Sequence, residues 1–239
     1  MRSSSVLVFV AAMGCVVLRA ADYHFAENGS DANDGFAPAT ALRTIGRLNV
    51  LDLKPGDRVL FRRGDLFRGA IEAKSGVTYA AYGEGANLPT ICASKRDYAD
   101  PKLWVKTSEP NVWRCTEKLH NVGIVLFDCE PRRIDGMPVV AEMRLPKREE
   151  PFDKPVVLDA DLAFRNLFRE DRLELRSDKG NPGERFRHIE IGEHGHCLWI
   201  NADDLLIENL HLTLSGSHGV GGSGERRNVT VRNCRIRGN

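Results

Sequence analysis

Residues 194–239 read HGHCLWINADDLLIENLHLTLSGSHGVGGSGERRNVTVRNCRIRGN and repeat themselves in register every 24 residues. The matching positions are His194-Gly195 and His218-Gly219, residues 204–209 and 228–233, and Leu212 and Ile236. A unit of this length cannot bury its apolar face alone, so it must stack on a copy of itself. The repeat therefore predicts a solenoid.

Two solenoid architectures fit this period. The spacing of Ile207, Leu210 and Leu212 matches a leucine-rich repeat, which needs a helix or similar element to cover the far side of each strand. However, the connecting run 215–224 holds five glycines, and glycine is unfavourable inside a helix. The alternation in residues 229–231 is typical of short strands with one buried face. The repeat thus favours a parallel β-helix, with these inward residues stacked on one another: Leu205, Ile207, Leu210 and Leu212 on Val229, Val231, Cys234 and Ile236.

Two asparagines stand at the same place in successive repeats. Asn209 and Asn233 each separate two short strands, where the chain must turn. Stacked asparagine amides can hydrogen-bond from coil to coil and satisfy the turn backbone at each level. We therefore expect Asn209 and Asn233 to form a structural ladder with their side chains close together.

The first residues, 1–21, have the features of a secretory signal peptide. A basic start at Arg2 precedes an apolar run, residues 6–18, that is too short to span a bilayer, and Ala20 stands just before the expected cleavage point. A retained N-terminal anchor is the alternative. Cleavage predicts a protein that is secreted, periplasmic or held at a bacterial cell surface, with no membrane span left in residues 22–239.

Composition narrows the classes of partner and site. The net charge is +1, with 28% charged residues of both signs, so no strong field favours nucleic acid or a membrane surface. Five cysteines follow the signal peptide, an odd number without a CxxC spacing, so no metal site is expected. Cys234 replaces Leu210 in the repeat and should fill core space. A disulfide among Cys92, Cys115 and Cys129 is left open.

Upstream of the repeat, the pattern predicts an N-terminal cap and a mostly β body. A short amphipathic helix with Thr40 as its N-cap is predicted by apolar residues three apart: Leu42, Ile45, Leu48 and Leu51. The acidic run 28–35 lacks the spacing of an EF-hand and predicts a plain turn rather than a calcium loop. Short apolar runs between residues 59 and 91 predict strands. Residues 142–153 predict a surface loop, and the middle of the chain, which lacks the 24-residue register, is either irregular coils or an insertion.

The C-terminal residues lie in the turn of a coil, with no capping element after them. Two clear coils are fewer than the three that a solenoid needs, and the last coil of an uncapped solenoid exposes an open edge. We therefore expect residues 22–239 to be the N-terminal cap and first coils of a longer β-helix domain.

Several segments together resemble one family: residues 23–35 (YHFAENGSDANDG), 38–45 (PATALRTI), 53–64 (LKPGDRVLFRRG), 79–85 (YAAYGEG) and 228–234 (NVTVRNC). They resemble the secreted bacterial right-handed parallel β-helix proteins of the pectate-lyase-like superfamily. The resemblance implies an all-β fold, a right-handed parallel β-helix with a short N-terminal capping helix. Members include polysaccharide lyases, glycoside hydrolases, epimerases and proteins of unknown activity. Their catalytic groups generally lie on a strand face of middle coils, which implies a position beyond Asn239 here.

Few residues of this chain are candidates for chemistry. The repeat would stack His194 on His218 at a coil corner, as a sugar-binding edge, as an unfinished catalytic site or as simple turn residues. Arg226 and Arg227 could meet an acidic sugar or serve as solvated surface charge. The acidic pair 203–204 falls at a turn, and neighbours on a strand point to opposite faces, so it predicts paired turn residues rather than two catalytic carboxyls. No catalytic residue is identified.

The resemblance predicts a carbohydrate-active protein, a polysaccharide lyase or glycoside hydrolase whose catalytic coils lie largely beyond residue 239. Its partner would be a polysaccharide. No cofactor is expected, except calcium if the protein is a lyase. The alternative is a non-catalytic solenoid for glycan binding or cell-surface attachment, because fold analogy does not establish activity.

Overall fold

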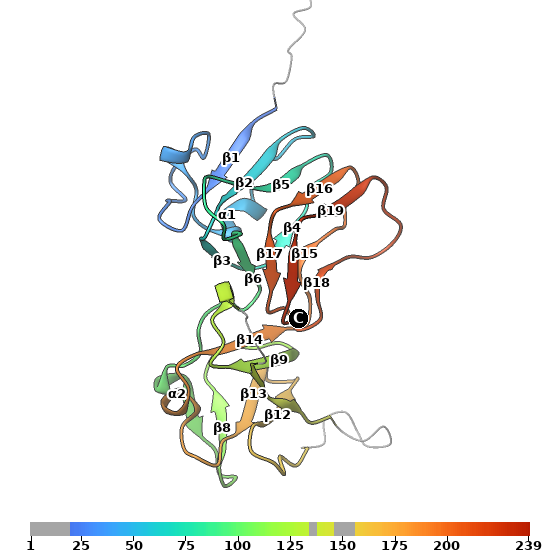
Figure 1. Ribbon diagram of the computed structural model, residues 1–239. Helices are drawn as coiled ribbons and strands as arrows, with labels where there is room; N and C mark the ends of the chain where they lie inside the picture. Colours follow the sequence, from blue (N-terminus) through green and yellow to red (C-terminus); the bar gives the residue numbers. More distant parts are fainter. Residues whose placement is uncertain (1–19, 134–137, 146–155) are drawn as a thin grey trace, which may run out of the picture.

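The computed structural model describes residues 20–133, 138–145 and 156–239. The predicted signal peptide lies outside these residues apart from its last two positions, and most of the predicted loop 142–153 lies outside them too. The chain forms two lobes (Figure 1). We call residues 20–92 and 196–239 the β-helix lobe and residues 93–195 the insertion.

Three parallel sheets build the β-helix lobe, and each of the three middle coils contributes one strand to each sheet in turn, whereas the first described coil supplies only β1 and the last supplies only β19 and β20. Sheet A consists of β1 (Asp22–Phe25), β2 (Arg58–Arg62), β5 (Thr78–Tyr82), β16 (Leu205–Glu208) and β19 (Val229–Arg232). Sheet B consists of β3 (Leu66–Arg68), β6 (Thr90–Cys92), β17 (His211–Thr213) and β20 (Arg235–Arg237). Sheet C consists of β4 (Ile71–Glu72), β15 (His196–Trp199) and β18 (His218–Gly221). The predicted all-β parallel β-helix is confirmed.

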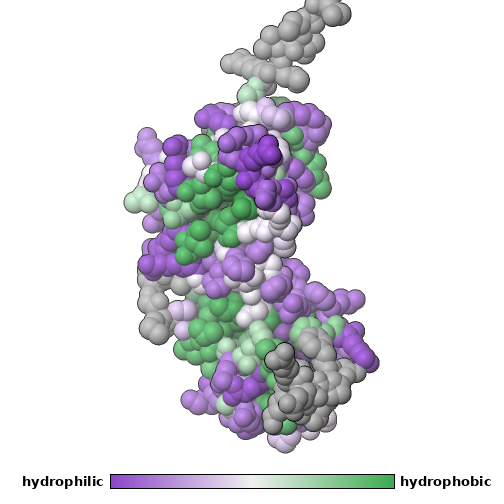
Figure 2. All heavy atoms as spheres, turned by 90° about the vertical axis from the view of Figure 1, so that its right-hand side faces the viewer, coloured by the Kyte–Doolittle hydropathy of each residue, from purple (hydrophilic) through white to green (hydrophobic). Residues whose placement is uncertain are grey.

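Sheets A and B keep the 24-residue register that the sequence predicts. Leu205 pairs with Val229, and Leu212 pairs with Ile236. All four predicted inward residues of the earlier coil are buried: Leu205, Ile207, Leu210 and Leu212. In the last coil Val231 and Ile236 are 41% and 46% exposed, because no described strand stacks on them. Figure 2 shows apolar side chains gathered on the side of the upper lobe that carries β19.

Sheet C has a different register, which corrects the predicted histidine stack. The residue opposite His218 is His196, not His194, so the spacing here is 22 residues. The connection from β18 to β19 is two residues longer than the connection from β15 to β16. The extra length shifts sheet C relative to sheets A and B. Sequence similarity at the first histidine of each repeat therefore points to the wrong partner.

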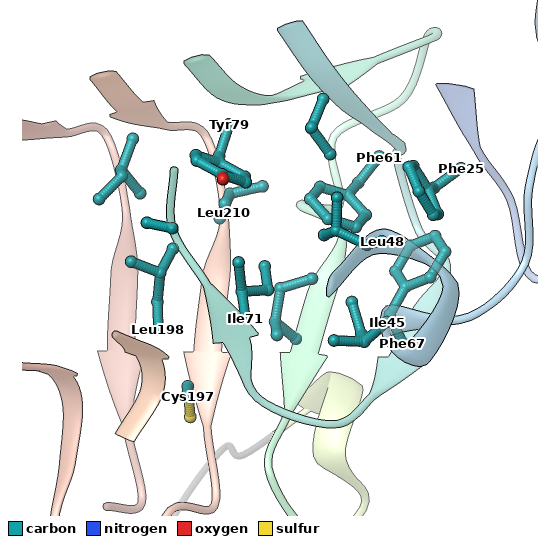
Figure 3. Packing of buried hydrophobic residues seen from close by; sticks show 14 of the residues in the cluster. Phe25, Ile45, Leu48, Phe61, Phe67, Ile71, Tyr79, Cys197, Leu198 and Leu210 are labelled. Carbon is teal, nitrogen blue, oxygen red and sulfur yellow. The ribbon is translucent and has the colours of Figure 1, made fainter. Parts of the chain in front are cut away.

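The interior of the β-helix lobe is apolar (Figure 3). The rings of Phe25, Phe61 and Phe67 follow one another, with centroids 5.5 and 5.0 Å apart. The predicted helix is α1 (Ile45–Asn49), which buries Ile45 and Leu48 in this core. Its cap differs from the prediction.

The N-cap of α1 is Thr44, whose hydroxyl accepts a hydrogen bond from the Arg47 amide at 3.0 Å. Thr40, the predicted N-cap, instead ends a separate 3₁₀ turn, η1 (Pro38–Thr40). At the other end, Asn49 bonds to the backbone of Ala70 and Glu72 beside β4, the edge strand of sheet C. The helix thus satisfies exposed polar groups at that edge.

The acidic run 28–35 is a turn whose carboxylates are used by the chain itself. Asp31 accepts hydrogen bonds from the amides of Arg43 and Thr44 at 2.9 Å each. Asp34 accepts from the Thr40 hydroxyl at 2.7 Å. This confirms the plain turn.

The three cysteines among which a disulfide was considered are buried free thiols, so no disulfide joins them: Cys92, Cys115 and Cys129.

The middle of the chain is an insertion rather than irregular coils. One sheet holds β7 (Trp104–Lys106), β8 (Val112–Cys115), β13 (Arg172–Arg176), β12 (Ala163–Leu167) and β11 (Glu142–Met143). A second holds β10 (Val139–Val140), β9 (Val122–Phe127) and β14 (Ile189–Glu193). The remaining helical turns are η2 (Pro101–Leu103), η3 (Pro131–Arg133) and α2 (Pro182–Arg185). Most of these strands pair antiparallel, and they enclose their own core. The β-helix continues on both sides of the insertion, because β5, which precedes the insertion, pairs directly with β16, which follows it.

Three glycines allow the two lobes to meet backbone to backbone. A methyl group at Gly123 of the insertion would overlap the carbonyl of Gly216 in the β-helix lobe. Gly192 likewise faces the carbonyl of Leu214 at close range. The Gly216 amide donates to the Glu193 carbonyl at 2.8 Å. Gly216, one of the five glycines in the run 215–224, is therefore required for the contact between the lobes.

Candidate functional site between the two lobes

The outer face of sheet B is the surface on which the insertion rests. Because side chains alternate along a strand, the middle residue of each strand points inward and its neighbours point outward. The strand register places the outward residues in two rows: Leu66, Thr90, His211 and Arg235; and Arg68, Cys92, Thr213 and Arg237. These rows bring together residues from coils that the insertion separates in sequence.

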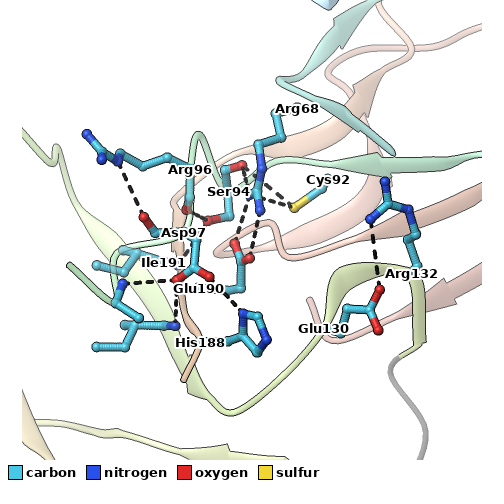
Figure 4. Close-up of polar contacts among 12 residues, drawn as sticks. Arg68, Cys92, Ser94, Arg96, Asp97, Glu130, Arg132, His188, Glu190 and Ile191 are labelled. Atoms are coloured by element: carbon cyan, nitrogen blue, oxygen red, sulfur yellow. Dashed lines mark hydrogen bonds and ion pairs between the residues drawn. The ribbon is translucent and has the colours of Figure 1, made fainter. Parts of the chain in front are cut away.

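The second row is anchored to the insertion by a buried ion pair. The Arg68 guanidinium donates to both oxygens of Glu190 at 2.9 and 2.8 Å and to the Ser94 carbonyl at 2.9 Å (Figure 4). The side chain of Glu190 is 1% exposed and that of Arg68 is 26% exposed. Burial raises the pKa of Glu190. Burial would lower the pKa of Arg68, but the hydrogen bonds and the charge of Glu190 outweigh it, so the pKa of Arg68 is raised. We take the pair to be ionised, because both carboxylate oxygens accept an N–H bond.

A second polar group supports this junction. Asp97 accepts hydrogen bonds from the His188 ring at 2.8 Å and from the Ile189 amide at 3.0 Å (Figure 4). Burial opposes its charge, but the hydrogen bonds from Ile189, His188 and Ala99 lower the pKa of Asp97. The strand that carries Glu190 is therefore held in place from both sides.

His211 and Arg235, from the first of the two rows, line a cleft of about 520 Å³ between the lobes. Its polar lining is Asn87, Glu130, Arg132, Arg133, His211 and Arg235. The β-helix lobe supplies the imidazole, one guanidinium and the amide, and the insertion supplies the other groups around η3. The cleft exists only because the insertion returns to the coil that it interrupts.

Arg132 fixes one wall of the cleft. Its guanidinium donates to both oxygens of Glu27 at 2.9 and 2.7 Å, and its Nε donates to the Gly64 carbonyl at 3.3 Å. Glu130 lies 3.9 Å from the same guanidinium (Figure 4). On the opposite side, the His211 ring contacts the Thr90 hydroxyl at 3.3 Å. Arg132 is thus a structural clamp, whereas Arg133 is exposed beside it.

The chemistry of this lining suits ligand binding. Three guanidinium groups, an imidazole and an amide offer many N–H donors to hydroxyl or carboxylate oxygens. Glu130 is the single carboxylate among the described lining residues. Most glycosidases use two carboxyls at a set separation, so these residues do not assemble that pair.

The sequence-predicted candidates lie elsewhere. His218 is exposed on sheet C, and His194 is exposed before β15. Arg226 bonds to the Ile200 carbonyl at 3.2 Å and so lies at the turn from sheet C to sheet A. Arg227 uses its backbone, donating to Asp203 at 3.0 Å. The structure therefore gathers His218 and Arg226 on the sheet C side and none of the four in the cleft.

The predicted asparagine ladder has the expected positions, but the predicted hydrogen bond between the two side-chain amides is not formed. Asn209 and Asn233 occupy equivalent turns with φ of 57° and 53°. No hydrogen bond joins their amides in the described part of the chain; the Asn209 N–H donates instead to the Arg232 carbonyl at 3.3 Å. The left-handed backbone, which asparagine tolerates, explains the residue.

The side-chain bond between coils is found one corner earlier. There Asn228 donates to Asp204 at 2.7 Å. The acidic pair 203–204 therefore consists of turn residues, as predicted.

Sequence reasoning missed the cleft residues. Alternation along β17 and β20 could have placed His211 and Arg235 on the outer face. Nothing local could have brought Arg132 and Arg133 beside them.

Among the described residues, no group of three or more His, Cys, Asp or Glu side chains could hold a metal ion. None of the described helices is both long and apolar enough to cross a membrane.

Comparisons with known proteins find similar structures but no matching family. No family model matches the chain, and no curated protein matches it. The structure of XylC with xylose has a TM-score of 0.52 at 17% identity, covering 82% of this chain and 36% of that chain. A GH136 lacto-N-biosidase from Eubacterium ramulus gives 0.41 at 17% identity, covering 90% and 34%. A further structure described as a glycoside hydrolase gives 0.44 at 9% identity, covering 82% and 51%.

This chain spans about a third of the length of the XylC chain. At such low identity the likeness concerns the fold alone. With the sheet topology it supports one conclusion, that the chain forms a parallel β-helix interrupted by an insertion.

Proposed function

We propose that this chain is the N-terminal portion of a secreted, carbohydrate-active β-helix protein, a polysaccharide lyase or glycoside hydrolase whose catalytic coils lie largely beyond residue 239. The interlobe cleft is its sugar-contacting site within this portion. The observation that carries the proposal is the cleft itself, a cavity of about 520 Å³ lined by N–H donors from both lobes. Clefts with a few convergent polar groups are the default binding sites of proteins.

The lining residues have distinct roles in this proposal. Arg133 and Arg235 donate to sugar hydroxyl or carboxylate oxygens, and Asn87 adds a neutral donor and acceptor. Arg132 stays on Glu27 and positions η3. Glu130 accepts hydrogen bonds from sugar hydroxyls. The similar structure of XylC contains xylose, which is consistent with a carbohydrate ligand here.

A second candidate function is a non-catalytic glycan-binding or cell-surface solenoid. The single carboxylate in the described cleft lining favours it, because that lining binds without supplying an acid and a base. The two functions share the binding step and differ in turnover.

Calorimetric titration of the chain with xylohexaose, cellohexaose, mannohexaose and trigalacturonate tests the binding step. We expect at least one oligosaccharide to bind, and the Arg133→Gln variant to bind it about 10-fold more weakly, as for loss of one charged hydrogen bond. Arg237→Gln is the control, because Arg237 lies on the outer face of sheet B, two residues from the cleft residue Arg235, but outside the cleft lining. Equal affinity of both variants and the parent would remove the cleft from the proposal.

Turnover by the complete gene product separates the two functions. Release of new reducing ends from a polysaccharide indicates a hydrolase, and absorbance of unsaturated uronates indicates a lyase. Binding without either product on the whole panel favours the non-catalytic solenoid.

A further inference from the structure

A second groove, of about 540 Å³, lies on the outer face of sheet C, away from the interlobe cleft. Its lining includes Glu72, Lys74, Trp199 and Asn201. The strand register places Trp199 beside Glu72 on neighbouring strands. The inward residues of the same strands are Ile71 and Leu198, which are fully buried. Trp199 is therefore the large aromatic side chain on the outward face of this sheet.

Contacts with histidine hold the indole of Trp199 at the surface. The ring of His196 lies 4.3 Å from that of Trp199, centroid to centroid, and 5.3 Å from that of His218. A methyl group at Gly221 would collide with the His196 ring, so the glycine provides the space that the imidazole fills. Burial, and then the neighbouring His218, lower the pKa of His196. His196 thus packs against Trp199, which remains half-buried with part of its surface in solvent.

The composition of the groove indicates that it takes a ligand. Glu72 and Lys74, which line the groove, form no ion pair with any described residue, so both charged groups are available to a ligand. An aromatic plane flanked by a carboxylate and an ammonium group is a common composition of a small-molecule site.

We infer that this groove is a second binding site, for a neutral pyranose unit of a glycan. One face of a pyranose ring with equatorial hydroxyls carries only C–H groups, which pack on the indole plane of Trp199. The hydroxyls at the ring edge then reach the Glu72 carboxylate, the Lys74 ammonium and the Asn201 amide. The charges of Glu72 and Lys74 cancel, so the groove does not select an acidic sugar. The inference rests on the proposed function only in taking the ligand to be a glycan.

Intrinsic fluorescence provides the test, because the chain has three tryptophans and one of them lies in the groove. The chain is titrated with xylohexaose and cellohexaose, and with trigalacturonate as the charged comparison. A neutral hexaose should quench the emission, and the signal should be absent in Trp199→Phe and retained in Trp113→Phe. Because Trp199→Phe lacks the reporter, its affinity is measured by calorimetric titration with the same hexaoses. Glu72→Ala, an exposed substitution that leaves the fold intact, should weaken the binding about 5- to 10-fold.

The outcomes separate this inference from the proposed function. If Arg133→Gln weakens oligosaccharide binding while Trp199→Phe and Glu72→Ala do not, the cleft binds the glycan and the groove inference is wrong. Equal affinity for trigalacturonate and the neutral hexaoses also overturns it, and so does a parent chain that binds neither neutral hexaose. Loss of binding in Trp199→Phe and Glu72→Ala, with Arg133→Gln unchanged, supports it independently of the cleft.

Discussion

Replacing Arg68 by methionine should destabilise the chain far more than an ordinary surface substitution. The change leaves Glu190, whose side chain is 1% exposed, without the guanidinium that bonds both its oxygens. Removing one partner of a buried ion pair leaves an uncompensated charge and typically costs about 3–5 kcal/mol. Since the pair joins strands 122 residues apart, the loss should also loosen the contact between the lobes.

Urea unfolding followed by tryptophan fluorescence measures this cost. Arg58→Met is the matched control, because Arg58 also bonds a carboxylate, that of Asp22, but their side chains are 53% and 36% exposed. An exposed pair contributes about 0–1 kcal/mol. The double variant Arg68→Met with Glu190→Leu should recover much of the loss, because apolar residues can replace a buried pair at little cost.

Two results would refute this reasoning. If Arg68→Met costs no more than Arg58→Met, Glu190 is not buried against Arg68 as described. If the double variant is less stable than Arg68→Met alone, Glu190 contributes through some other contact.

Three further predictions concern single positions. Gly123→Ala should cost at least about 2 kcal/mol by overpacking against Gly216. Gly46→Ala, in α1, should be neutral or stabilising by up to about 1 kcal/mol, because its Cβ would meet the Thr44 hydroxyl at an ordinary contact distance of 3.7 Å; thermal unfolding compares the two variants. The depressed pKa of Asp31 contributes stability that is present above the unfolded value, about 4, and is lost as pH falls through the folded value, so Asp31→Asn should flatten the decline in urea midpoint between about pH 5 and pH 2. Asn233→Ala should cost about 1 kcal/mol because of its positive φ, and Asn233→Gly should cost less; equal losses in chemical denaturation would contradict the backbone explanation.

The sequence by itself determined the solenoid and the register of two sheets. Leu205 and Val229 stack because alternation and a fixed coil length are local properties of the chain. The turns at Asn209 and Asn233 were also readable, since a left-handed residue between two short strands favours asparagine. The sequence did not give the exact start of the helix, because the N-cap of α1 is Thr44 rather than the predicted Thr40.

The histidine register shows how a small change in length defeats a repeat. Equivalent-looking residues in sheets A and B are equivalent in space, but the longer last connection moves His218 opposite His196. A repeat read from sequence fixes strands only when every connection between them has the same length. The predicted stack on His194 therefore had no support in the fold.

The candidate site was decided by tertiary structure. The contact between Arg132 and Glu27 joins residues 105 apart, and that between His211 and Thr90 joins residues 121 apart. Alternation states which side of a strand His211 occupies, but it does not state what covers that side. The cover is the insertion, and its position depends on backbone contacts at glycines and on one buried ion pair. Such contacts depend on shape and charge matched across the two lobes, which no local pattern in either lobe encodes.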